Sequence, residues 1–166
     1  MSEIVVRRAR PEDAPGMARV HTRSWQETYR GLVPDRVLDA PTATERREKW
    51  WRDSLSADDR ADRIAVAVLA GTVVGIASAG PARDSDAPHA WELYVLYVLK
   101  AHHGSGAGQR LLDAVLEGRA SVLRVADPNP RAQAFYRRNG FVPDRSREPF
   151  GTGHEIRMVR SAVRGA

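Results

Sequence analysis

The chain has no cysteine and only two lysines, and the absence of cysteine excludes a class of chemistry. Without cysteine the protein forms no disulfide and carries no thiol nucleophile, which suits a reducing compartment. The longest apolar runs are far shorter than the roughly 20 residues that a membrane-spanning helix needs. The chain moves directly into Ile4-Val5-Val6 without a charged and apolar leader. We therefore expect a cytoplasmic protein that does not associate with membranes.

Arginine supplies nearly all of the positive charge, because the only lysines are Lys49 and Lys100. The net charge of +5 would suit a polyanionic partner. The arginines, however, are spread over the whole chain among many carboxylates, and they form no basic tract with interleaved aromatic residues. This distribution disfavours a nucleic-acid partner, which stays open only as an alternative.

The 166 residues are sufficient for one domain spanning 1–166 with a sizeable core. Strand and helix patterns alternate, but not as a strict β-α-β series, which predicts a single mixed α/β or α+β domain. A polar break is expected at 56–62. The expected strands are 3–9, 64–69, 73–79, 91–99, 122–126, 141–142 and 155–159, and the expected helices are 11–30, 42–55, 109–118 and 129–139.

The most informative segment joins the apolar run 93–99 to the helical pattern that follows it. It reads His102-His103-Gly104-Ser105-Gly106-Ala107-Gly108, with glycine at every second position from 104 onward. Glycine permits backbone conformations in which several N–H groups converge at the first turn of a helix. These unpaired amides and the positive end of the helix dipole attract an anion, so the loop predicts a phosphate site. A merely flexible loop is the alternative.

Two common nucleotide motifs do not fit this loop. A dinucleotide fold needs Gly-x-Gly-x-x-Gly after the first strand, whereas here Gln109 follows Gly108 and the loop comes late in the chain. A P-loop needs a lysine after its glycines. The pair His102-His103 has no third spaced ligand, so we expect no metal. A serine hydrolase of the Gly-x-Ser-x-Gly kind is also not indicated, because no serine lies in that motif.

Three segments also carry a resemblance to a known family. They are ELYVLYV at 92–98, HGSGAG at 103–108 and NPRAQAFY at 129–136 with Gly140-Phe141 after it, while 4–9 and 25–31 are similar more weakly. In order and spacing they resemble the GNAT superfamily of acetyl-CoA-dependent N-acetyltransferases. The resemblance implies a single GNAT-like α/β (α+β) domain, with a central, mixed, mostly antiparallel sheet flanked by helices. It also implies acetyl-CoA as co-substrate and direct acetyl transfer to a primary amine, without a metal.

In that family the amides of a Gln/Arg-x-x-Gly-x-Gly/Ala loop hold the pyrophosphate of coenzyme A. Here Gly106 and Gly108 take the glycine positions, and His103 replaces the usual Gln or Arg. The resemblance further implies that an exposed strand edge pairs with the pantetheine amides and that Asn129 bonds the pantetheine arm, although an asparagine before Pro130 is also a good helix cap. The implied cofactor-binding residues are Leu96, Tyr97, Val98, His103, Gly104, Ser105, Gly106, Ala107, Gly108 and Asn129.

Acetyl transfer needs a base and an acid. A primary amine has an ordinary pKa of about 10.4 and must lose a proton before it attacks, and the resemblance implies Glu92 as the acceptor of that proton. The departing thiolate leaves more easily when protonated, and the resemblance implies Tyr136, two helical turns after Asn129, as the acid. On a regular strand Glu92 would share a face with every second residue up to Val98. An ion pair of Glu92 with an arginine and simple core packing of Tyr136 both stay open.

His21, Trp25 and Tyr29 recur at every fourth residue and form a stripe on the first long helix. Side chains in a stripe of this kind usually belong to the hydrophobic core. In the family, however, this helix walls the acceptor site, so the resemblance implies that Trp25 and Tyr29 bind a small-molecule amine, with Glu27 or Asp35 offering charge.

Several questions stay open at this level. Trp50 and Trp51 are interpreted as packing anchors, although adjacent helical residues point in different directions. The sequence does not identify the amine, which can belong to a small molecule or to the N-terminus or a lysine of a protein. It also does not identify the acyl chain or the oligomeric state, so a homodimer remains an alternative to a monomer. A non-catalytic acyl-CoA-binding module of the same fold is the alternative to an enzyme.

Overall fold

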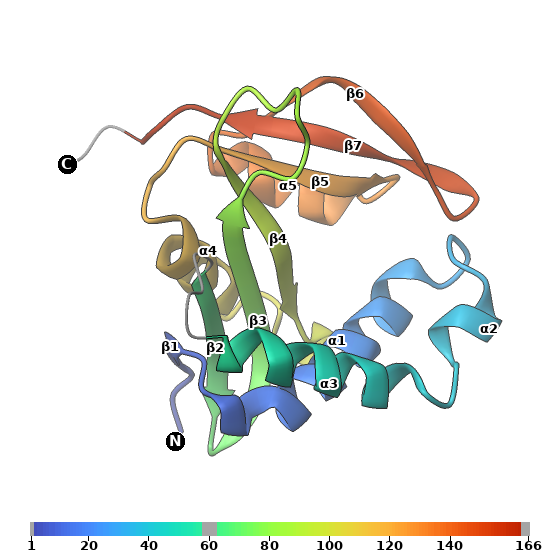
Figure 1. Cartoon of the computed structure of the whole chain (residues 1–166), viewed down its shortest axis with the longest axis vertical. Helices are drawn as coiled ribbons and strands as arrows, with labels where there is room; N and C mark the ends of the chain where they lie inside the picture. Colours follow the sequence, from blue (N-terminus) through green and yellow to red (C-terminus); the bar gives the residue numbers. More distant parts are fainter. Residues whose placement is uncertain (1, 58–62, 164–166) are drawn as a thin grey trace.

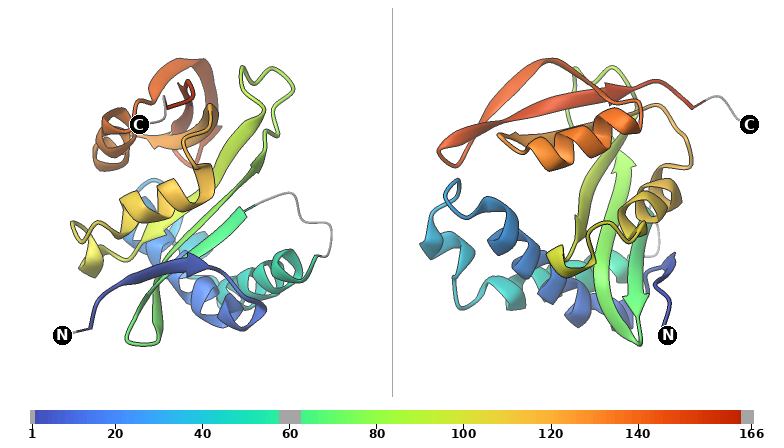
Figure 2. Two further views of the ribbon diagram at one scale, coloured as in Figure 1. Left: turned by 90° about the vertical axis from the view of Figure 1, so that its left-hand side faces the viewer. Right: turned by 180° about the vertical axis from the view of Figure 1, so that it is seen from behind.

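The computed structural model describes residues 2–57 and 63–163, and within these ranges helices cover both faces of a seven-stranded sheet (Figures 1 and 2). The strand order is β1-β2-β3-β4-β5-β7-β6. The strands are β1 (Val5–Arg8), β2 (Arg63–Leu69), β3 (Thr72–Pro81), β4 (Trp91–Val98), β5 (Ser121–Asp127), β6 (Val142–Phe150) and β7 (Gly153–Arg160). The helices are α1 (Ala14–Tyr29), α2 (Asp35–Leu38), α3 (Ala43–Ser56), α4 (Ala107–Leu116) and α5 (Pro130–Arg138), with single 3-10 turns η1 (Pro11–Asp13) and η2 (Lys100–His102).

The sheet divides between β4 and β5, which form its parallel pair while the other neighbouring strands run antiparallel. These two strands pair only where Glu92 meets Val122 and Leu93 meets Leu123. Beyond that point the edge of β4 that faces β5 has no strand partner within the described ranges, while its other edge stays paired with β3 as far as Val98. Figure 1 shows the result: β2 to β4 stand upright, and β5 to β7 lie across their upper end.

Strand β4 also contains a bulge. Ser78 of β3 pairs with Val95 and the next residue, Ala79, pairs with Leu93, so that Tyr94 is an extra residue on β4. An extra residue of this kind bends a strand and shifts the alternation of its side chains by one position.

The bulge overturns one expectation about the faces of β4. Leu93 packs into the same hydrophobic cluster as Leu96 and Val98, although regular alternation would place it opposite them. Glu92, the neighbour of Leu93, therefore lies on the other face. The expectation that Glu92 shares a face with Leu96 and Val98 is wrong, because it assumed a regular strand.

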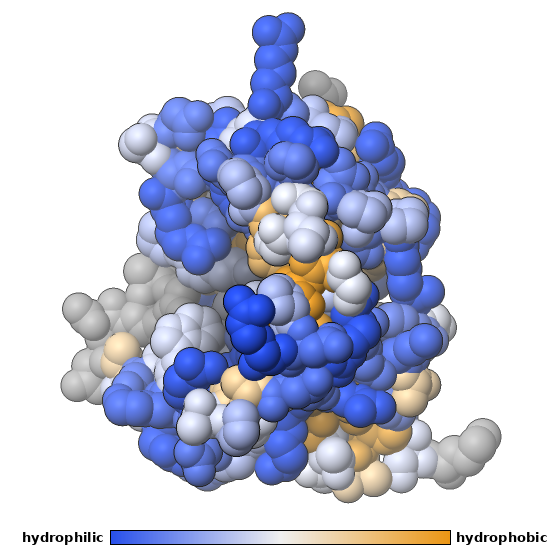
Figure 3. All heavy atoms as spheres, turned by 90° about the vertical axis from the view of Figure 1, so that its right-hand side faces the viewer, coloured by the Kyte–Doolittle hydropathy of each residue, from blue (hydrophilic) through white to orange (hydrophobic). Residues whose placement is uncertain are grey.

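Two hydrophobic clusters hold the helices to the two faces of the sheet. On one face α4 packs through Leu111, Leu112 and Leu116, each 0% exposed, and Phe141 joins them. On the other face α1 and α3 pack through residues such as Met17 and Trp51. Hydrophilic residues cover most of one side of the molecule, and apolar residues show in its middle and in its lower part (Figure 3).

Most expected elements are present. The start of α5 is confirmed in detail, because the Asn129 side chain accepts a hydrogen bond from the Ala132 N–H at 3.3 Å and Pro130 is the first helical residue. The single-turn α2 was not expected from the sequence. The polar break expected at 56–62 lies mostly outside the described residues. No helix in the described ranges is long and apolar enough to cross a membrane.

The expected strand at 141–142 proves far too short, since β6 runs from Val142 to Phe150. Its sequence is polar and contains Pro143 and Pro149, which argue against a strand in the middle of a sheet. At the outer edge of this sheet, next to β7 alone, a polar strand with prolines is tolerated because one row of its backbone groups needs no partner strand.

We expect Leu111→Ala to lower the free energy of unfolding by about 2–5 kcal/mol, because it leaves a cavity between α4 and the sheet. Urea unfolding followed by circular dichroism measures this loss. Val142→Ala, at a side chain that is 56% exposed, is the matched control and should change stability by less than about 0.5 kcal/mol. Equal effects of the two substitutions would contradict the core described above.

Candidate functional site

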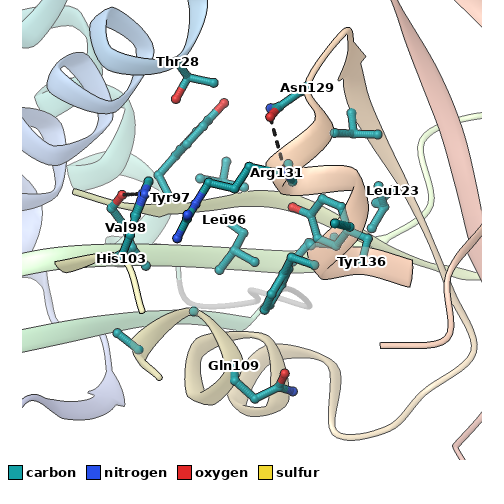
Figure 4. Close-up of a pocket in the computed structure, with 18 of the residues that line it drawn as sticks. Thr28, Leu96, Tyr97, Val98, His103, Gln109, Leu123, Asn129, Arg131 and Tyr136 are labelled. Carbon is teal, nitrogen blue, oxygen red and sulfur yellow. Dashed lines mark hydrogen bonds between the residues drawn. The ribbon is translucent and has the colours of Figure 1, made fainter. Parts of the chain in front are cut away.

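A cleft of about 760 Å³ opens where β4 and β5 separate. This volume lies within the range of about 300–1,000 Å³ that is typical of small-molecule sites. Its walls are the free edge of β4, part of β5, the loop and first turn of α4, one side of α5 and the last turn of α1 (Figure 4). The cleft thus brings together the glycine loop, the Asn-Pro helix and Tyr29, the last residue of the aromatic stripe.

Tyr136 projects from α5 into this cleft (Figure 4). Its side chain is 8% exposed, and its ring contacts those of Phe135 and Phe141 edge to face, with centroids 5.4 and 5.9 Å away. Burial raises the pKa of Tyr136 above the ordinary value for a phenol, because the charged form would be poorly solvated. The phenol therefore keeps its proton at neutral pH and is available as a proton donor.

The glycine loop presents backbone amides to the cleft. Gly104 and Gly106 have φ of 82° and 85°, in the left-handed region that favours glycine, and Gly106 is the N-cap residue directly before α4. Gly108 has no such constraint, but a Cβ atom there would lie 3.9 Å from Phe135 and from Val98, so this position faces the cleft. The first turn of α4 therefore directs unpaired N–H groups into the cavity.

The other residues expected at the cofactor site are nearly all found on the cleft wall. Leu96, Tyr97 and Val98 line it along the free edge of β4, and the Val98 carbonyl accepts a hydrogen bond from His103 Nε2 at 2.9 Å. Asn129 lines the cleft while it caps α5. Ser105 does not line the cleft; its hydroxyl accepts a hydrogen bond from the Ala107 N–H at 3.3 Å and so supports the start of α4.

Glu92 is placed differently from the other expected residues. Its side chain is buried and does not line the cleft. The carboxylate accepts hydrogen bonds from the backbone N–H of Arg83 at 2.9 Å and from its guanidinium at 3.1 and 2.6 Å. The ion pair that the sequence left open is thus present.

Tyr29 lines the cleft at the end of α1, and Trp25 packs against the Tyr29 ring outside the cleft wall. The hydroxyls of Tyr29 and Tyr97 lie 3.0 Å apart, and burial raises the pKa of both phenols. Trp25 does not line the cleft; its ring packs against Tyr29 with centroids 5.0 Å apart. Glu27 lines the cleft and accepts a hydrogen bond from the Lys100 N–H at 3.2 Å, whereas Asp35 pairs with Arg30.

Two arginines of this site were not expected from the sequence. Arg131 and Arg138 of α5 line the cleft, and neither pairs with a carboxylate among the described residues. Figure 4 shows that the Arg131 side chain extends into the cavity. Their spacing of two helical turns, on the helix that carries Tyr136, is the signal that could have revealed them.

No group of three His, Asp or Glu side chains in the described ranges is arranged to hold a metal.

Comparison with known proteins identifies relatives of this chain. A model of the Acetyltransferase (GNAT) family matches residues 23–141. The "Uncharacterized N-acetyltransferase YuaI" of Bacillus subtilis is 34% identical over 113 residues, 66% of this chain, and the match spans 60% of that protein. The "Probable N-acetyltransferase Rv2775" of Mycobacterium tuberculosis is 27% identical over 86% of this chain and 82% of its own length.

A solved structure has the same fold. It is the PaiA N-acetyltransferase of Thermoplasma acidophilum in complex with coenzyme A, with a TM-score of 0.74 and 20% identity over 97% of this chain and 99% of that one. At this identity the likeness concerns the fold alone.

His21 lies at the other end of the aromatic stripe. Its Nδ1 accepts a hydrogen bond from the Trp51 indole at 3.2 Å, and its ring contacts that of Tyr97 at 5.7 Å. Burial, with a smaller contribution from the charge of Arg47, lowers the pKa of His21 to about 3. The imidazole is therefore neutral in the folded protein throughout the physiological range.

This lowered pKa predicts acid destabilisation. An unfolded histidine takes up a proton near pH 6.5, whereas folded His21 stays neutral down to about pH 3, so stability is lost as the pH falls between these values. Between pH 6.5 and 4.5 we expect His21 to contribute about 2 kcal/mol of the loss. Urea unfolding at the two pH values should show a smaller loss in His21→Gln than in the wild type. His154→Gln, at an exposed histidine, should keep the full loss; equal losses in all three proteins would contradict the prediction.

Proposed function

Because the chain belongs to the acetyltransferase (GNAT) family, we propose that it transfers an acetyl group from acetyl-CoA to a primary amine on a small molecule. One observation carries the proposal: the amides at the start of α4 open into the same cleft as the buried, protonated Tyr136. An anion-binding element and a proton donor thus share one cavity. The coenzyme A bound by the Thermoplasma protein supports the choice of co-substrate.

The described residues fit coenzyme A chemically. Its pyrophosphate would be held by the N–H groups of Gly106 and Gly108 and by the positive end of the α4 dipole. Arg131 and Arg138, which have no carboxylate partner in the described ranges, supply further positive charge for its phosphates. The unpaired backbone groups of β4 suit the amides of the pantetheine arm as an added strand would. The acetyl-coenzyme supplies the thioester that is cleaved.

Tyr136 is proposed as the acid of the reaction. The thiolate released by acyl transfer needs a proton, and the phenol of Tyr136 carries one at neutral pH. The packing of its ring between Phe135 and Phe141 holds the hydroxyl in place, so no reorganisation is needed when the thiolate forms.

The acceptor amine is proposed to bind at the end of the cleft formed by the last turn of α1. Tyr29 offers a hydroxyl there, and the carboxylate of Glu27 offers negative charge for a cationic amine. Glu92 remains the proposed acceptor of the amine proton. Because it is buried outside the cleft wall and oriented by Arg83, it would act through ordered water.

A direct assay tests the proposal. The protein is incubated with acetyl-CoA and a panel of primary amines, and the released thiol is measured. Turnover of at least one small amine is expected. Binding of acetyl-CoA without any thiol release would favour the non-catalytic module instead, and release only with peptide or protein amines would overturn the small-molecule acceptor.

Tyr136→Phe should lower kcat roughly 10²-fold, because the thiolate loses its proton donor. The Kd for coenzyme A, measured by calorimetry, should change little, since the ring and its packing remain. An unchanged kcat would remove Tyr136 from the mechanism.

Gly108→Asp should weaken coenzyme A binding by at least about tenfold, because a carboxylate at the first turn of α4 competes with the pyrophosphate for the same amides. The fold should persist, since the position has an ordinary φ and room for a Cβ atom. Gly108→Ala adds the Cβ without the charge and should bind coenzyme A with an affinity close to that of the wild type. Equal binding by both variants would refute the assignment of the phosphate site.

A further inference from the structure

A second cavity of about 240 Å³ lies between α1 and α3. It is lined by His21 from α1 and by Ala43, Arg46, Arg47 and Trp50 from α3. None of these residues lines the large cleft, so the two cavities have separate walls. The proposed acetyl transfer gives the second cavity no role.

The cavity concentrates positive charge that is not neutralised. Arg47 is half-buried, and its guanidinium lies over the Trp25 ring at 5.1 Å and donates a hydrogen bond to Thr22 Oγ1 at 3.0 Å. Neither Arg47 nor Arg46 has a carboxylate within ion-pair distance among the described residues. Burial is the main cause that lowers the pKa of Arg47; the like charge of Arg46 also lowers it, while Tyr97 acts in the opposite direction.

The other cations of α3 differ in this respect. Lys49 pairs with Asp53 at 2.6 Å, and Arg52 pairs with Glu48 at 2.5 Å, each one helical turn away. Carboxylates are therefore available on the helix, but they lie away from the two arginines of the cavity. Among the described residues, the two arginines of the cavity are thus the cations of this helix without a carboxylate partner.

The remaining walls are formed by His21, Trp50 and the small side chain of Ala43. His21 accepts the Trp51 hydrogen bond through Nδ1, so its proton is on Nε2, which is a donor only. Trp51 is fully buried, whereas the adjacent Trp50 is 49% exposed with its ring 4.5 Å from that of Trp51. The expectation that both tryptophans are packing anchors is confirmed for Trp51, whereas Trp50 packs against Trp51 with only about half of its surface buried. A large apolar ring is left at the rim of a cationic cavity.

We propose that this cavity binds a small organic anion, whose carboxylate pairs with Arg46 and Arg47 and whose flat apolar part packs against Trp50. Guanidinium groups bind carboxylates through paired charge-assisted hydrogen bonds, and the cavity wall contains no acidic residue that would compete. The volume is below that of sites for drug-sized ligands, which favours a molecule the size of a single substituted ring. The site is independent of the acetyl-CoA cleft.

Benzoate is a suitable probe. In an NMR titration of the ¹⁵N-labelled full chain at constant ionic strength, benzoate should shift the indole N–H signal of Trp50 saturably, and saturating coenzyme A should not displace it. Benzamide has the ring without the charge and should bind about tenfold more weakly, as loss of a charge-assisted hydrogen bond predicts. Inorganic phosphate has charge without a ring and should also bind more weakly; equal affinity for phosphate would overturn the aromatic part of the proposal.

Substitutions locate the binding. Arg46→Gln, at an exposed residue, should weaken benzoate binding about tenfold without loss of thermal stability, and Arg47→Gln should do the same if it folds. Arg52→Gln, at a paired arginine of the same helix, is the matched control and should leave the affinity unchanged. Absence of a saturable shift in the wild type, equal affinity in Arg46→Gln, or displacement by coenzyme A would each overturn the proposal. None of these outcomes depends on whether the protein is an acetyltransferase.

Discussion

The separation of β4 from β5 after only two paired residues is the constraint on which the site depends. Had the two strands remained paired, their backbone groups would satisfy each other and no cleft would exist. Instead, the free edge of β4 must find other hydrogen-bond partners, because unpaired backbone groups away from water are costly. Water meets this need in an empty cleft, and a ligand with amide groups meets it equally well. The cleft is thus made by the main chain, and side chains add to it.

Packing on both faces keeps the separation open. On one face Leu111 and Leu112 fix α4 against the sheet, so that the first turn of this helix lies at the cleft. Across the cleft, the Asn129 cap fixes the start of α5. On the opposite face Tyr29 meets Tyr97 through a hydrogen bond between their hydroxyls. The three helices therefore approach the free edge of β4 from different directions, which is why residues far apart in the sequence line one cavity.

Local signals in the sequence predicted the parts of the site that depend on local structure. The alternating glycines before α4 and the Asn129-Pro130 cap each act within one helical turn, and both are where the sequence places them. The position of Glu92 could not be predicted in this way, because it depends on how β3 pairs with β4 at the Tyr94 bulge. Likewise, only the packing of α3 against α1 decides which of the two adjacent tryptophans is buried.

The two prolines of β6 have a consequence for the outer boundary of the sheet. Pro143 and Pro149 carry no backbone N–H, so the last strand lacks two of the donors with which a further strand from another molecule would pair. The polar side chains between them make that border still less suited to a neighbour. Continuous β-stacking of one copy onto the next is therefore disfavoured at this border by the covalent structure of the two prolines.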